Sequence, residues 1–161
     1  MKHLKSYTKL FESKSEIMEF VDYLKHDLQD DDLAIRESDT RDFLIHKYKS
    51  LRSQSYKFEE GRKKRYEESV FMEKEALVFD LINISHKKYG LSTYLNLYDA
   101  EPHVKRLLDY AKGLGYNNFE VRKITQMSRK SQDVTQSFTG KGRLPESAKR
   151  EILILQILIM K

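Results

Sequence analysis

The sequence predicts an α+β domain, with helices packed on one face of a small, mainly antiparallel sheet and an apolar helix at the C-terminus. Two observations predict this class. Helix-like and strand-like apolar spacings follow one another along the 161 residues, and the last segment is apolar nearly all round. A chain of this length forms one ordinary domain with one core. We expect residues 13–161 to be that domain.

A capping box predicts that the first helix begins at residue 13, because Ser13 and Glu16 can each satisfy a free backbone N–H of the first turn. Apolar residues then recur at helical spacing and form one stripe: Ile17, Phe20, Val21, Leu24 and Leu28. The acidic turn 30–32 should end the helix. Residues 33–36 and 43–48 resemble two short strands joined by the polar turn 38–40, so a hairpin is expected next.

The middle of the chain is predicted to contain two further helices. Apolar positions between residues 70 and 82 indicate a long helix that ends near Gly90. Residues 94–98 alternate as a strand, and Asp99 is the expected N-cap of a helix closed by Gly113 or Gly115. Residues 118–124 alternate as a further strand, although a helix is an open alternative there.

The C-terminal segment 152–160 contains nine residues of which only Gln156 is polar. An element that is apolar on all sides has to be buried, either as a central core helix or at a subunit interface that would make a homo-oligomer. Its β-branched residues leave a buried strand as the alternative.

The composition indicates what class of protein this is but does not indicate its function. Charged residues make up 34% of the chain, apolar residues 39%, and the net charge is +5. Cysteine is absent, so neither disulfides nor thiolate metal sites are available, which fits a cytoplasmic protein. No apolar run approaches the ~20 residues that a membrane helix needs, and no membrane association is expected.

Motifs of catalytic and cofactor sites are missing from the sequence. The five histidines form no His-Glu-x-x-His pair, and neither a nucleophile elbow nor a phosphate-binding loop occurs. The two glycines at 113 and 115 lack the third glycine of a dinucleotide fingerprint. We therefore expect a protein without catalytic activity, cofactor or metal.

A basic segment begins after residue 126, where seven basic residues stand against three acidic ones. Residues 133–145 resemble the end of a phage-repressor-type helix-turn-helix, and residues 118–127 would then have to form the preceding helix. The resemblance implies a DNA-binding transcriptional regulator, with phosphate contacts from basic side chains. The alternative is a solvated basic loop. The candidate nucleic-acid contacts are Arg129, Lys130, Thr135, Gln136, Lys141 and Arg143, together with the separate cluster Arg62, Lys63, Lys64 and Arg65.

The N-terminal segment 5–12 resembles the capsid-targeting leader on internal head proteins of T-even-like tailed phages. In that family a prohead protease removes the leader after a Leu-x-Glu or Ile-x-Glu tripeptide, and Leu10-Phe11-Glu12 fits, with Leu10 and Glu12 as the processing residues. The resemblance implies a bacteriophage accessory protein that is packaged in the phage head and acts in the host cytoplasm. The alternative is that residues 1–12 tether the chain end to the domain.

These observations lead to one preferred function and one alternative. The preferred function is that of a non-enzymatic phage accessory protein which binds a host factor, such as an inhibitor of host defence. The alternative is the DNA-binding regulator. The partner is accordingly a host protein or nucleic acid.

Overall fold

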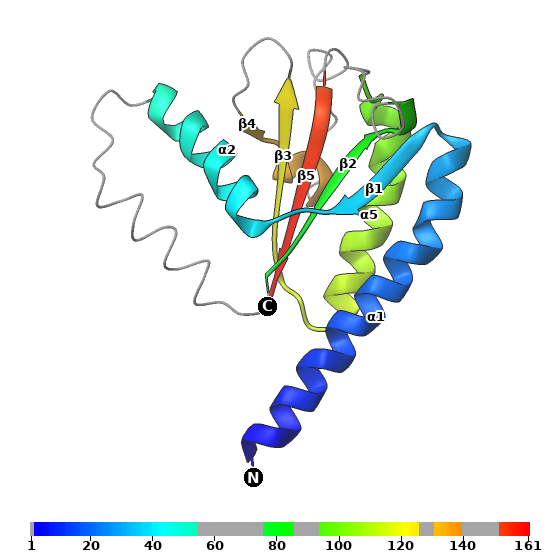
Figure 1. Cartoon of the computed structure of the whole chain (residues 1–161), viewed down its shortest axis with the longest axis vertical. Helices are drawn as coiled ribbons and strands as arrows, with labels where there is room; N and C mark the ends of the chain where they lie inside the picture. Colours follow the sequence, from blue (N-terminus) through cyan, green and yellow to red (C-terminus); the bar gives the residue numbers. More distant parts are fainter. Residues whose placement is uncertain (1, 55–75, 86–93, 126–130, 140–151) are drawn as a thin grey trace.

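The computed structural model describes residues 2–54, 76–85, 94–125, 131–139 and 152–161. The centre of the fold is a five-stranded, fully antiparallel sheet in the order β1-β2-β5-β3-β4 (Figure 1). Its strands are β1 (Leu33–Glu37), β2 (Leu77–Asn83), β3 (Asn118–Thr125), β4 (Ser131–Asp133) and β5 (Ile152–Met160). The described helices are α1 (Lys2–Asp30), α2 (Thr40–Gln54), α5 (Leu97–Gly113) and α6 (Thr135–Thr139). The predicted α+β class is confirmed.

The main core lies between the sheet and the helices α1 and α5, which run side by side (Figure 1). Helix α1 contributes its apolar stripe from Ile17 to Leu28, as its spacing predicts. Phe20 of α1 stacks on Tyr110 of α5 with ring centroids 4.2 Å apart. The sheet contributes alternate residues of β2 and β5, such as Phe79 and Ile157, because successive side chains of a strand point to opposite faces.

The opposite face of the sheet is covered by α2, which lies apart from α1 and α5 in Figure 1. Phe43 of α2 packs on Val78 of β2 and Leu158 of β5. The expectation that helices pack on one face only is therefore wrong. Residues 43–48 were expected to form the second strand of a hairpin, and they lie in α2 instead. The apolar pair Phe43 and Leu44 fits the buried side of a helix as well as a short strand, so the local pattern does not decide between them.

The structure corrects the expected helix over residues 70–82 and the expected C-terminal helix. Residues 77–83 form β2 and residues 152–160 form β5. Both strands are flanked by strands on their two edges and covered on their two faces, so they lack the alternation of a half-exposed strand. The apolar C-terminal element is therefore part of the core of the domain and does not form a separate apolar surface.

Helix α1 begins at Lys2, so Ser13 does not start a helix. Residues 2–12 contain neither proline nor glycine, and nothing in their sequence interrupts the helix before the capping box. The first turns of α1 extend beyond the sheet and beyond α5 (Figure 1). The first residue of α1 in the described core is Ile17.

Helix α5 begins three residues earlier than expected, because its N-cap is Asn96 rather than Asp99: the Asn96 side chain accepts the Tyr98 backbone N–H at 3.0 Å. It ends at Gly113, and Gly115, two residues later, has a φ of 95° in the left-handed region that glycine tolerates, as expected for the glycine that closes a helix. Strand β3 confirms the strand expected over residues 118–124. Among the described helices, none has the length and apolar character to cross a membrane.

Candidate functional site

A row of polar residues crosses the whole sheet, one on each strand. The register pairs Arg36 with Asp80, Asp80 with Gln156, Gln156 with Arg122, and Arg122 with Asp133. On β2 and β5 the row lies between apolar pairs on the same face, the face that α2 covers. Polar groups in a sheet interior cost free energy unless they are hydrogen-bonded, so such a row requires an explanation.

The half of the row around Arg122 is fully hydrogen-bonded. Its guanidinium donates to Ser131 Oγ at 2.7 Å, to the Ser131 carbonyl at 3.1 Å and to Glu120 Oε1 at 2.9 Å. Lys47 of α2 then donates to Glu120 Oε2 at 2.7 Å. Arg122 thereby joins β3 to β4, and Glu120 joins β3 to α2.

The half of the row around Asp80 is not fully hydrogen-bonded. Asp80 and Gln156 are both nearly inaccessible, and among the described residues Asp80 Oδ1 and Gln156 Oε1 have no hydrogen-bond partner. Burial raises the pKa of Asp80 above its ordinary value, against the opposing effect of the Arg36 guanidinium. The Arg36 Nε atom lies 3.4 Å from Asp80 Oδ2, which is a long contact.

The row ends at a cleft of about 610 Å³ on the open edge of the sheet. Strand β4 pairs only with residues 122–124 of β3, so the edge of β3 before residue 121 has no neighbouring strand among the described residues. The chain leaving β4 closes the next position: Val134 N–H donates to the Val121 carbonyl at 2.8 Å, and Val121 N–H donates to Thr135 Oγ1 at 2.9 Å. The cleft is lined by Lys47, Phe119, Glu120, Lys123, Gln132, Asp133, Val134, Thr135, Gln136 and Ser137.

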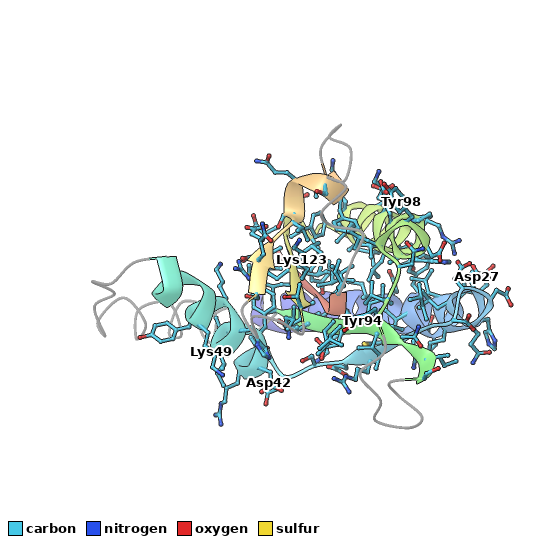
Figure 2. The ribbon with its side chains drawn as sticks, turned by 90° about the horizontal axis from the view of Figure 1, so that it is seen from above. Asp27, Asp42, Lys49, Tyr94, Tyr98 and Lys123 are labelled. Atoms are coloured by element: carbon cyan, nitrogen blue, oxygen red, sulfur yellow. The ribbon has the colours of Figure 1, made fainter. Side chains whose placement is uncertain are left out.

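The charged groups of the cleft differ in whether they have partners. Glu120 is held by Arg122 and Lys47, and Asp133 Oδ1 accepts the Thr135 N–H at 2.9 Å. Lys123 is only 8% exposed, yet no ion pair or hydrogen bond of its ammonium group is found within the described residues. Figure 2 places Lys123 on β3, on the side where α6 lies and away from Asp42 and Lys49 of α2.

The predicted nucleic-acid residues are only partly described. Thr135 and Gln136 lie in α6 and line the cleft. Residues 118–125 form a strand, so the preceding helix that a helix-turn-helix needs is not present there. Arg129, Lys130, Lys141, Arg143 and the cluster Arg62, Lys63, Lys64 and Arg65 lie outside the described residues. The processing residues Leu10 and Glu12 lie in the first turns of α1.

Sequence reasoning missed Lys123, Asp80, Gln156 and Arg122 as site candidates. A signal was present for two of them, because Asp80 and Gln156 each interrupt an otherwise apolar strand. No group of three or more His, Asp or Glu side chains that could hold a metal ion occurs within the described parts of the chain. The comparisons with protein families, curated proteins and solved structures found no match.

Proposed function

We propose that this chain is a non-enzymatic phage accessory protein that binds a host factor, and that residues 1–12 are a removable leader. On this proposal the protein is carried in the phage head, and residues 13–161 act in the host cytoplasm, for example as an inhibitor of host defence. The resemblance of residues 5–12 to a capsid-targeting leader supports the phage origin.

The observation that carries this proposal is the place of the expected cut on α1. A cut after Glu12 falls within α1, the helix whose first turns project beyond the rest of the fold (Figure 1). Among the residues whose burial is described, the first core residue of α1 is Ile17, five positions after the expected cut. A removable segment has to be dispensable for stability, and on this proposal residues 1–12 are such a segment.

The chemistry of the cleft supports binding rather than catalysis. Its acidic groups, Glu120 and Asp133, are engaged in hydrogen bonds that hold β3, α2 and α6 together. General acid–base catalysis needs a titratable group that is free to exchange a proton with a substrate. The carboxylates of the cleft have structural partners instead.

The first experiment is processing by the prohead protease of a T-even-like phage, followed by intact mass measurement. We expect one product that begins at Ser13, and a Glu12→Ala variant should not be cut. Glu19→Ala is the matched control, because Ile17-Met18-Glu19 has the same tripeptide pattern but Ile17 is buried in the core. An uncut parent chain, or equal cutting after Glu19, contradicts the leader.

The DNA-binding regulator is the alternative function. It requires a helix over residues 118–127, but residues 118–125 form strand β3. An electrophoretic mobility shift with random duplex DNA separates the two functions. DNA binding that weakens steeply with salt would favour the DNA-binding regulator over the host-factor proposal, because such salt dependence indicates phosphate contacts from the basic segments. The host-factor proposal expects no shift at low salt.

A further inference from the structure

We propose that the cleft is the docking site for an extended segment of the partner protein, which adds to the open edge of β3 and places an acidic side chain against Lys123. This inference rests on the proposed function as a binder of a host protein, and it names the chemistry of the segment that is bound. Strand addition obtains affinity from main-chain hydrogen bonds and specificity from side-chain pockets.

Among the described residues, the edge of β3 at the cleft has backbone hydrogen-bonding groups without a partner. The N–H and C=O groups of Val121 both point away from β5, toward Thr135 and Val134. In an antiparallel ladder this orientation repeats at every second residue, so the N–H and C=O groups of Phe119 point the same way. Phe119 lines the cleft and lies before the residues that β4 pairs with. An extended peptide can therefore donate to and accept from Phe119.

Lys123 supplies the charge that the segment has to complement. A lysine that is about nine-tenths buried is rare unless its ammonium group is paired, because desolvation of a charge costs free energy. The Nζ atom is not among the fully buried side-chain atoms, and Lys123 lines the cleft. The two carboxylates of the cleft are already hydrogen-bonded to other groups. A carboxylate from outside is the complementary partner for this ammonium group.

Lys123 lies on the same face of the sheet as Phe119. The edge of β3 at Lys123 is paired with β4, and Val134 and Thr135 fill the position at Val121, so a bound strand can pair with β3 only before Val121. Phe119 and Lys123 are four residues apart, about 13 Å along the strand, so an acidic side chain of the bound segment and the Lys123 side chain meet in the cleft between them. The volume of about 610 Å³ lies within the range of ligand clefts, roughly 300–1,000 Å³.

The test uses the full chain and a defined probe. The probe is a mixture of fluorescein-labelled octapeptides that have a fixed central glutamate and valine, threonine or isoleucine at the other positions. We expect saturable binding in fluorescence anisotropy and a shift of the Phe119 amide signal in NMR spectra. Matched mixtures replace the glutamate by glutamine, or carry N-methyl groups beside it, and each should bind at least tenfold more weakly.

Variants of the protein assign the effect to the cleft. Lys123→Met keeps most of the buried stem and removes the charge, and it should weaken binding at least tenfold. Gln136→Glu is an exposed change that places a negative charge in the cleft, so it should also weaken binding without affecting the core. Lys49→Met removes an exposed lysine of α2 that does not line the cleft, and it should leave binding unchanged.

Three results would overturn the inference: no peptide binding up to 1 mM, equal binding of the glutamine mixture, or a shift of the Lys123 signals by inorganic phosphate alone. The last result would make the cleft a site for small anions. The leader proposal has a separate readout, since protease cleavage after Glu12 does not depend on Lys123. A processed protein without peptide binding therefore rejects only the docking site, and peptide binding by an unprocessed chain rejects only the leader.

Discussion

Asp80 of β2 lies directly opposite Gln156 of β5, and each of these buried side chains has an oxygen atom without a hydrogen-bond partner among the described residues. Gln156 and Ser38 hydrogen-bond to the Asp80 carboxylate, so the unsatisfied acceptors are one oxygen of each residue. An unsatisfied buried acceptor costs about 1–3 kcal/mol of stability. Proteins retain such groups mostly where another requirement outweighs that cost.

The substitution Asp80→Asn should stabilise the protein by about 1–2 kcal/mol at pH 7, because the amide is uncharged and burial disfavours the charge of the carboxylate. The pKa of Asp80 is raised in the folded state, chiefly by burial, so folding favours the protonated form. The stability that Asp80 contributes is therefore greatest below its unfolded pKa and is lost as the pH rises through the folded pKa. Urea unfolding at pH 7 and at low pH measures this difference.

The advantage of Asp80→Asn should disappear at low pH, where the parent carboxyl group is already protonated. Asp109→Asn is the matched control, because Asp109 is exposed on α5. It should change stability little at either pH. A destabilised Asp80→Asn protein at pH 7 would mean that the Arg36 contact matters more than burial.

Arg122→Met should destabilise the protein by about 3–5 kcal/mol, because it removes the hydrogen bonds of the buried guanidinium to Ser131 and Glu120. It leaves Glu120 with Lys47 as its remaining partner. Adding Glu120→Gln should then cost less than it costs in the parent protein, because its Arg122 partner is already absent. Arg106→Met removes an exposed guanidinium and serves as control. Denaturant unfolding of the four proteins gives a double-mutant cycle for the pair. Additive effects of the two substitutions would show that the pair is not coupled.

Asp27 of α1 and Arg106 of α5 form a surface pair, with 2.8 Å between Oδ2 and Nη2 (Asp27 is labelled in Figure 2). The hydrogen bond from Arg106 lowers the pKa of Asp27 below its ordinary value of 3.8. The contribution of this pair to stability is present above the unfolded pKa and is lost as the pH falls through the folded pKa. Arg106→Gln should therefore raise the pKa of Asp27, as measured by the carboxyl carbon shift in an NMR titration. Lys105→Gln, which breaks a pair with Glu101, should leave it unchanged.

The sequence predicted the elements whose two sides differ in polarity. The stripe from Ile17 to Leu28 has one buried side, so its period identifies a helix. Strand β3 alternates because one of its covered faces is mainly apolar and the other holds the hydrogen-bonded residues Glu120 and Arg122. Strand β5 has both faces covered, and a run such as residues 152–160 has the same pattern in a buried helix as in a buried strand. Residues 43–48 are a similarly short apolar run without a decisive period.

The candidate site could not be predicted from the sequence because it depends on strand order and register. The polar row joins residues 36, 80, 156, 122 and 133, which become neighbours only when β5 inserts between β2 and β3. The cleft depends on β4 being three residues long, so that part of the β3 edge stays open. Lys123 is an ordinary polar residue of a strand until those neighbours are known.

Asp32 has a left-handed backbone with φ of 56°, directly after α1 and before β1. Asparagine also tolerates this conformation, and replacing Asp32 by asparagine removes a negative charge near the negative C-terminal end of the α1 dipole. Asp32→Asn should therefore stabilise the protein by about 0.3–1 kcal/mol in thermal unfolding. Asp32→Val should destabilise it, because a β-branched residue is strained at positive φ. Asp30→Asn changes the charge without the strained backbone, so it separates the two effects.

If residues 1–12 are a leader, their removal should leave the melting temperature within a few degrees of the parent value; the first residue of α1 in the described core is Ile17. Ile17→Ala in the shortened chain should cost about 2–5 kcal/mol, since it leaves a cavity in a fully buried position. Glu16→Ala, which changes an exposed neighbour in the same turn, should have a small effect. Thermal unfolding followed by circular dichroism compares the proteins. A large loss on truncation alone would show that the first turns of α1 act as a structural tether, and a removable leader would then be excluded.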